Sequence, residues 1–97
     1  MIVYISGAIT NDKHYRRKFA RAEKRLRKRR FEVINPAKMG DLLPKSFEHY
    51  DYLHIDLAML DRANAIYMLP GWIDSRGARI EFRTALRQGK EIWIEKR

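Results

Sequence analysis

The stretch from Asn64 to Phe82, NAIYMLPGWIDSRGARIEF, decides how the rest of this chain is interpreted. Its apolar run over residues 65–69 is short enough for one buried strand, and Pro70-Gly71 ends that strand. After a short loop, Ser75 is placed to cap a helix that carries Glu81 in its second turn. Strand, loop and capped helix in this order put backbone N–H groups and a carboxylate at the carboxyl edge of a sheet, where open α/β folds bind ligands.

The whole chain repeats this alternation of strands and helices. We expect strands over residues 2–5, 31–34, 65–69 and 91–95, and helices over residues 13–29, 47–62 and 76–88. Connections of these lengths imply right-handed crossovers and a parallel sheet, and a central first strand gives the strand order 2-1-3-4. The sequence therefore predicts one α/β domain over residues 1–97, with Ser6-Gly7 near residues 71–75 across the switch point.

Each expected helix carries one apolar stripe at helical spacing. The stripes consist of Tyr15, Phe19, Ala22 and Leu26; of Tyr50, Leu53, Leu57 and Leu60; and of Ala78, Phe82, Ala85 and Leu86. Residues 37–46 contain Gly40 and Pro44 and are predicted to form a loop, which is long enough to act as a flap over a site.

Composition restricts the classes of protein to which the chain can belong. Its 97 residues are 45% hydrophobic, which allows one small core, and self-association into a homo-oligomer is expected. The absence of cysteine excludes disulfides, thiolate zinc sites and cysteine nucleophiles, and fits a cytoplasmic location. No apolar run approaches the roughly 20 residues that span a bilayer, so no membrane partner is expected. The opening MIVYISG predicts a first strand and not a signal peptide.

The net charge of +9 comes from one segment. Residues 13–30 hold eleven Lys or Arg against a single acid, Glu23, for a local charge of +10, so the remaining residues sum to about −1. We interpret this segment as a solvated outer helix whose long side chains shield the core. Contact with nucleic acid or another anionic partner is the alternative, supported by charge density.

Two acids stand out as candidates for chemistry. Asp56 and Glu81 each border the apolar stripe of their helix, and neither has a basic residue three or four positions away. Two carboxylates at one crevice suit chemistry at an anomeric carbon, with Glu81 as nucleophile and Asp56 as its polar companion. The alternative is that both are surface acids paired with Arg or Lys from other elements. Ser75 is either only a helix cap or also a contact for phosphate or ribose.

Aromatic residues and histidines give weaker signals. Tyr4 and Tyr67 are most simply core residues of strands, while Trp72 lines either a pocket or an oligomer interface. His14, His49 and His54 show no grouping typical of a metal site. The GxGxxG, Walker and GxSxG motifs are absent, so we expect no metal, no NAD or ATP cofactor and no serine hydrolase triad.

Five motifs together resemble the small DUF4406-type proteins of the nucleoside 2-deoxyribosyltransferase-like superfamily. They are YISGAIT at residues 4–10, the series Tyr15, Phe19, Ala22-Glu23 and Leu26, VINP at residues 33–36, Asp56-Leu57 with Leu60, and LPGW-x-x-S-x-G-A-x-x-E at residues 69–81. The match runs nearly end to end. It implies a three-layer, flavodoxin-like α/β fold and cofactor-free chemistry at the N-glycosidic bond of a deoxynucleoside or its 5′-monophosphate, by transfer or hydrolysis.

The resemblance also implies roles for individual residues. Glu81 matches a nucleophilic glutamate that attacks C1′ and forms a glycosyl-enzyme, and Asp56 matches an aspartate associated with the sugar and with that glutamate. Ser75 matches a serine that contacts phosphate. The substrate-binding candidates are Tyr4, Ser6, Gly7, Ala8, Gly71, Trp72, Ser75 and Gly77. The position before the third strand, typically an aspartate in these proteins, is Asn64 here, and the C-terminal substrate-binding tail of the transferases has no counterpart. A non-catalytic nucleotide-binding module and a nucleic-acid-binding protein are the alternative functions.

Overall fold

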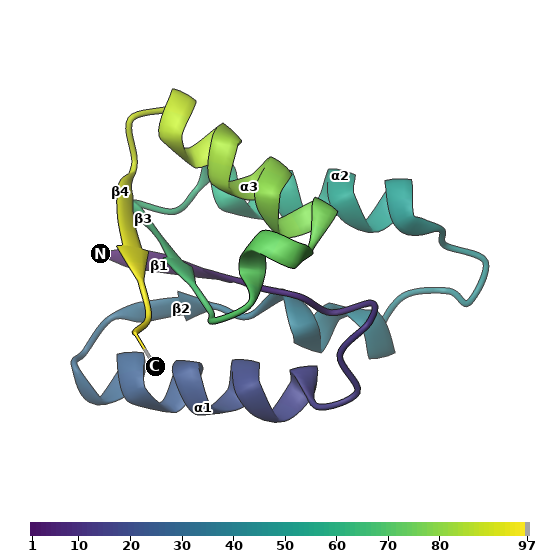
Figure 1. Cartoon of the computed structure of the whole chain (residues 1–97), viewed down its shortest axis with the longest axis horizontal. Helices are drawn as coiled ribbons and strands as arrows, with labels where there is room; N and C mark the ends of the chain where they lie inside the picture. The colour runs from purple at the N-terminus through teal and green to yellow at the C-terminus, as the bar shows by residue number, and fades with distance from the viewer. Residues whose placement is uncertain (97) are drawn as a thin grey trace.

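The computed structural model, which describes residues 1–96, contains one sheet of four parallel strands between two layers of helices (Figure 1). The strands are β1 (Ile2–Ser6), β2 (Glu32–Ile34), β3 (Ala65–Met68) and β4 (Glu91–Ile94). The helices are α1 (Tyr15–Lys28), α2 (His49–Asp61) and α3 (Arg76–Arg87), with 3-10 helices η1 (Pro36–Asp41) and η2 (Trp72–Asp74). The strand order is β2-β1-β3-β4, which confirms the predicted α/β architecture of the flavodoxin-like, three-layer kind.

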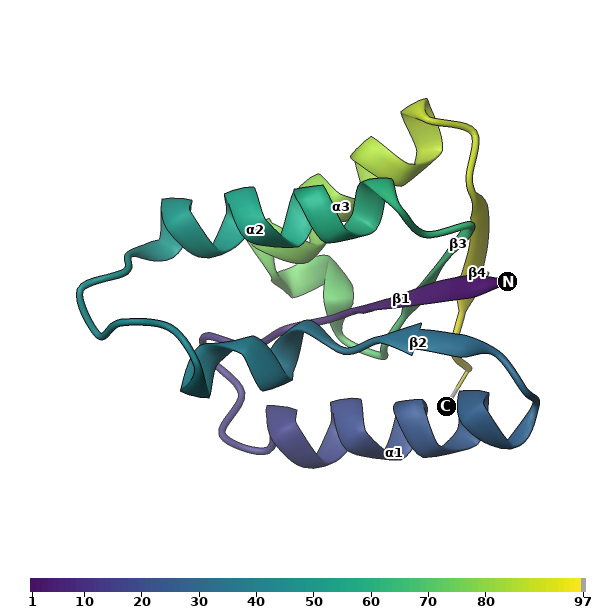
Figure 2. The same cartoon turned by 180° about the vertical axis from the view of Figure 1, so that it is seen from behind.

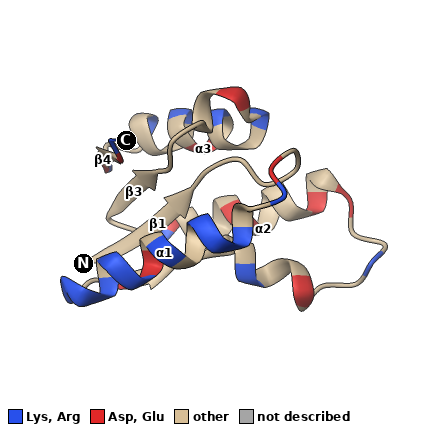
Figure 3. Ribbon diagram, turned by 60° about the horizontal axis from the view of Figure 1, so that its bottom comes forward, with Lys and Arg blue, Asp and Glu red and all other residues tan. Residues whose placement is uncertain are grey.

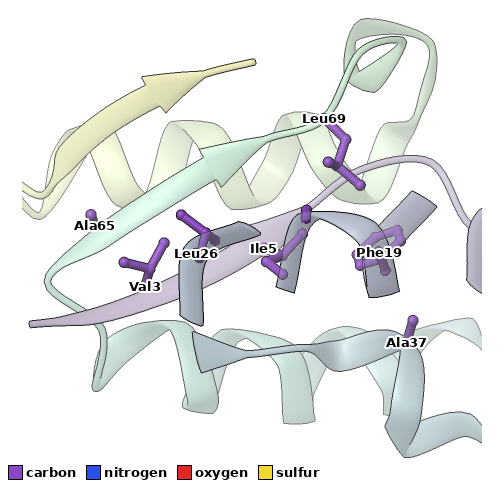
Figure 4. Close-up of a cluster of buried hydrophobic side chains, with 8 residues drawn as sticks. Val3, Ile5, Phe19, Leu26, Ala37, Ala65 and Leu69 are labelled. Carbon is purple, nitrogen blue, oxygen red and sulfur yellow. The ribbon is translucent and has the colours of Figure 1, made fainter. Parts of the chain in front are cut away.

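The helices cover both faces of the sheet, α1 on one side and α2 with α3 on the other (Figures 1 and 2). Each face has its own apolar core. Figure 4 shows the core on the α1 side, where Phe19 and Leu26 of α1 meet Val3 and Ile5 of β1. The core on the other side includes Tyr4, Leu60, Ile66, Met68, Ala78 and Ala85.

Strand β1 is central, and its residues from Val3 to Ser6 are 0% exposed because helices cover both faces of the sheet. Successive side chains of a strand point to opposite faces. Val3 and Ile5 therefore face α1, whereas Tyr4 and Ser6 face α3. This alternation places two hydroxyl groups of one strand on the same side of the sheet.

Helix α3 is rotated relative to the predicted stripe. Its buried residues are Ala78, Glu81 and Ala85, whereas Leu86 is 59% exposed. At 100° per residue Leu86 lies about 107° from the centre of the buried face, so its predicted burial is wrong. Glu81 belongs to the buried face itself and not to its border.

Two other expectations about the helices are corrected by the structure. Tyr50 is 70% exposed because it lies in the first turn of α2, where its ring contacts that of His54 instead of the core. That helix begins at His49, after a capping box made by Glu48 and Asp51, and not at residue 47 as predicted.

The segment predicted as a loop also contains a short helix. Its first part is η1, whose start is capped by Asn35, with the side-chain oxygen accepting from the Ala37 N–H at 3.0 Å. None of the helices in residues 1–96 combines the length and the apolar content that crossing a bilayer requires.

Candidate functional site

Glu81 is a buried carboxyl held at both of its oxygens by hydroxyl groups of β1. The Ser6 hydroxyl donates to Glu81 Oε1 at 2.6 Å, and the Tyr4 hydroxyl donates to Glu81 Oε2 at 2.8 Å. Tyr4 and Ser6 are 0% exposed and Glu81 is 6% exposed. Hydrogen bonds from two donors favour the charged form of a carboxyl, so this geometry can stabilise a glutamate anion away from bulk water.

Burial opposes that charge. Burial raises the pKa of Glu81 to about 8, and the charge of Asp56 raises it too, while the bonds from Ser6 and Tyr4 lower it. Burial likewise raises the pKa of Asp56 to about 6. The pKa of Tyr4 lies well above its usual value, because of burial and of the adjacent Glu81 charge. Two neighbouring carboxyls with raised pKa values resist ionising together, which favours the form of the pair that keeps one proton.

Glu81 and Asp56 line a cavity of about 600 Å³ at the carboxyl edge of the sheet. Of the sequence-predicted binding residues, Gly7, Ala8, Ser75 and Gly77 also line this cavity. Tyr4 and Ser6 do not line the cavity themselves, but both are hydrogen-bonded to Glu81, which does. The structure therefore brings together the two candidate acids and six of the eight candidate binding residues.

The turn after β1 meets the end of β3, as the strand order predicts. The Leu69 N–H donates to the Ser6 carbonyl at 2.8 Å. A Cβ placed on Gly7 would lie 3.0 Å from Leu69 Cβ, so any side chain at this position would require Leu69 to shift. The two turns thus close against each other directly beside Glu81.

Ser75 is confirmed as the N-cap of α3. Its Oγ accepts from the Ala78 N–H at 3.2 Å, and its side chain also lines the cavity. The hydroxyl proton of Ser75 is not used by the cap. The residue can therefore cap the helix and still donate to a ligand oxygen.

Gly71 and Trp72 lie outside the cavity lining. The Trp72 ring stacks on Phe82, with ring centroids 4.7 Å apart, and packs against the core on the α2 and α3 side. Gly71 adopts the left-handed conformation, with φ of 87°, and begins η2. A binding role for these two residues stays a prediction with no cavity contact behind it.

Sequence reasoning missed several polar and aromatic residues of the cavity. They include Arg16 of α1, His49 and Tyr52 of α2, and Arg76 and Arg79 of α3. His49, Tyr52 and Asp56 follow one another at intervals of three and four, which places them on one face of α2. This spacing is visible in the sequence, but it identifies His49 and Tyr52 as cavity residues only once Asp56 is known to face the cavity.

Asn64 lies at the other edge of the sheet. Its side-chain oxygen accepts from the Ile2 N–H at 2.7 Å, and this bond ties the start of β1 to the start of β3. An asparagine at this position consequently affects strand pairing and not the cavity. Within residues 1–96, no group of three or more His, Asp or Glu side chains is placed to hold a metal ion.

Comparison with known families agrees with this layout. Residues 1–94 match the family described as "Domain of unknown function (DUF4406)", and the chain belongs to that family. No curated protein matches the chain.

Proposed function

We propose that this DUF4406 protein breaks the N-glycosidic bond of a 2′-deoxynucleoside or its 5′-monophosphate, with Glu81 as nucleophile. The proposal draws on the resemblance to the nucleoside 2-deoxyribosyltransferase-like superfamily. One observation carries it: a buried glutamate faces a cavity, hydroxyl groups hold both of its oxygens, and a second carboxyl lies beside it. Structural acids seldom combine burial, like-charge contact and a cavity.

The shared proton suits this chemistry. Glycosidic bond cleavage through a covalent intermediate needs one carboxylate and one proton donor. In our proposal Asp56 takes the proton of the pair when substrate enters, which leaves Glu81 ionised. The hydroxyls of Ser6 and Tyr4 stabilise that anion without any rearrangement, because both already donate to it.

The proposed reaction has two steps. Glu81 attacks C1′, and the electron pair of the C1′–N bond leaves with the base, which takes a proton from the Asp56 carboxyl. Water or a second base then attacks C1′ of the glycosyl-enzyme. The Glu81 carboxylate is released, and the proton of the incoming group returns to Asp56.

The cavity fits the proposed substrate in volume and charge. A volume of about 600 Å³ lies within the range of small-molecule sites. Ser75, Arg76 and Arg79 lie at the start of α3, where the helix dipole and the two cations favour a phosphate. His49 and Tyr52 supply flat side chains on the α2 wall, against which a base can stack.

The test is base release from a panel of deoxynucleosides and deoxynucleoside 5′-monophosphates. We expect wild type to release base from at least one compound and Glu81→Gln to be slower by at least about a hundredfold. Glu32→Gln is the matched control, because Glu32 is exposed on β2 and lies outside the cavity lining. A wild type that releases no more base than Glu81→Gln across the whole panel contradicts the proposal.

Binding measurements separate the nearest alternative. If the protein is a non-catalytic nucleotide-binding module, wild type and Glu81→Gln would bind a deoxynucleotide with equal affinity, and neither would release base. Calorimetric titration of the same panel into both proteins gives this comparison.

A further inference from the structure

The outer face of α1 carries a straight row of cations, which we name the α1 stripe: Arg17, Arg21, Lys24 and Lys28. At 100° per residue these four side chains lie within about 60° of one another. The centre of the stripe lies about 160° from the centre of the buried apolar residues Phe19, Ala22 and Leu26. The α1 stripe is therefore the outermost ridge of this layer, and Figure 3 shows the charge along the helix.

Acidic side chains neutralise the flanks of α1 but not this ridge. The flanking cations form four ion pairs: Arg16 with Asp41, Lys18 with Asp12, Arg25 with Glu95 and Arg27 with Glu23. No member of the α1 stripe forms an ion pair or a side-chain hydrogen bond within residues 1–96, and all four are exposed. The fold thus pairs four cations beside the ridge with acids and leaves the four on the ridge without an acidic partner among residues 1–96.

A shallow hollow of about 570 Å³ lies beside the stripe. It is lined by Lys24 and Lys28 of the stripe, by the small residue Ala20, and by the acid Glu23 with its two ion-pair partners, Arg27 and Lys38. Because Glu23 accounts for one of these four cations, the open hollow keeps a net positive charge that attracts a phosphate group toward Lys24 and Lys28.

We propose that the α1 stripe binds the phosphate backbone of double-stranded DNA, independently of base sequence. The stripe runs from Arg17 to Lys28, and the eleven rises between them amount to about 16 Å along the helix axis. Phosphates on one strand follow each other every roughly 3.4 Å of duplex axis, so a row of this length reaches several of them. Lys and Arg side chains without other partners release counterions from DNA most effectively.

The composition of this face distinguishes duplex DNA from other polyanions. Single-stranded nucleic acid is bound with aromatic stacking platforms, and the stripe contains no aromatic residue. Duplex RNA is recognised partly through 2′-hydroxyl contacts, and the stripe has no hydroxyl or amide side chain to add to its cations. Insertion into an anionic membrane needs an apolar face, but the apolar face of α1 is buried against the sheet.

This inference does not depend on the proposed chemistry at Glu81, because none of the four stripe residues lines the cavity. The experiment is fluorescence anisotropy of a labelled 20-base-pair duplex, titrated with the full chain at a series of NaCl concentrations. We expect binding at 50 mM NaCl that weakens about a hundredfold by 200 mM, with a logarithmic salt slope of about −3 to −4.

A charge-matched pair of variants locates the contact. The stripe variant replaces Arg17, Arg21, Lys24 and Lys28 with Gln, and the control replaces Arg62, Arg83, Arg87 and Lys96 with Gln. Both lower the net charge by the same amount. We expect the stripe variant to lose binding and its salt slope to approach zero, while the control retains most of its affinity and its slope.

Several outcomes would overturn the proposal. They are no wild-type binding at 50 mM NaCl, an equal loss in both variants, or tighter binding of a single strand, an RNA duplex or a phosphatidylserine vesicle than of the DNA duplex. If the fourfold variant does not fold, two double variants replace it in the titration. One combines Arg17→Gln with Arg21→Gln, and the other combines Lys24→Gln with Lys28→Gln. Each should lose about half of the salt slope, and an unchanged slope in both contradicts the proposal.

Discussion

The Ser6 hydroxyl donates to Glu81 Oε1 at 2.6 Å across 75 residues of sequence. This bond joins the central strand to α3 and fixes one oxygen of the carboxyl. Tyr4, two residues earlier on the same face of β1, fixes the other oxygen at 2.8 Å. A side chain held at both oxygens has one orientation, which is what a nucleophile at an anomeric carbon needs.

The buried carboxyl makes the fold more stable at lower pH. The pKa of Glu81 is raised to about 8 in the folded chain, so the folded state binds more protons than the unfolded state between about pH 4.5 and 8. The free energy of unfolding therefore falls as pH rises through this window. Glu81→Gln removes the pH-dependent contribution of this carboxyl to the free energy of unfolding. We expect the variant to be more stable than wild type by more than about 1 kcal/mol at pH 8 and equally stable near pH 5. Urea unfolding at both pH values checks this, and a wild type equally stable at both contradicts it.

Replacing Asp56 is expected to change the pH dependence of base release. In the proposed mechanism the active form of the pair holds one proton, so activity should rise and then fall with pH. Asp56→Asn removes the proposed proton donor, and we expect a rate lower by about a hundredfold or more together with loss of the alkaline limb. Asp61→Asn, on the exposed end of the same helix, is the control. An alkaline limb that survives in Asp56→Asn would show that another group donates the proton.

Tyr4→Phe tests the role of the second hydroxyl. The change removes the donor to Glu81 Oε2, which stabilises the carboxylate form. We expect the pKa of Glu81 to rise further, so the acid limb of the activity profile moves to higher pH. Loss of the bond should also cost about 1 kcal/mol of unfolding free energy at neutral pH. If Tyr4→Phe is less stable than wild type but the acid limb of its activity profile does not move, Tyr4 has only a structural role.

The contact between the two site turns makes Gly7 sensitive to any side chain. Gly7→Ala places a Cβ 3.0 Å from Leu69 Cβ and 3.1 Å from its Cδ1, and Leu69 is itself buried. We expect a loss of about 1–3 kcal/mol in unfolding free energy. Gly40→Ala is the control, because a Cβ there meets no atom within 4 Å. Thermal unfolding of the two variants compares them, and an equal shift in both speaks against the contact.

A buried acid on α1 anchors η1, which forms one wall of the cavity. Glu23 accepts from Arg27, Asn35 and Lys38. Burial alone would raise the pKa of Glu23, but these bonds lower that pKa to about 2. The stabilisation is therefore present above about pH 4.5 and is lost as pH falls toward 2.

Glu23→Gln should remove the stabilisation that depends on the ionised Glu23 carboxylate. We expect a loss of about 1–3 kcal/mol at pH 7 and a smaller loss at pH 3. Denaturant unfolding at the two pH values measures it, with Glu32→Gln as the exposed control. The idea fails if the loss is the same at both pH values.

Local sequence patterns determined the arrangement of the backbone. The apolar runs, the helical stripes and the cap at Ser75 each depend on residues within a few positions of one another, and they gave the strand order and the edge where the site lies. The lack of helical partners around Asp56 and Glu81 was equally local. It was enough to select both acids, because i±3 and i±4 neighbours are fixed once a helix forms.

Only the tertiary structure decided what surrounds those acids. The rotation of α3 about its axis buried Glu81 and exposed Leu86, and the register of β1 against α3 brought Tyr4 and Ser6 to its oxygens. The same rotation turned Trp72 and Phe82 against each other, away from the cavity. Such contacts join residues up to 77 positions apart, and their geometry depends on how whole layers pack, which no short-range pattern encodes.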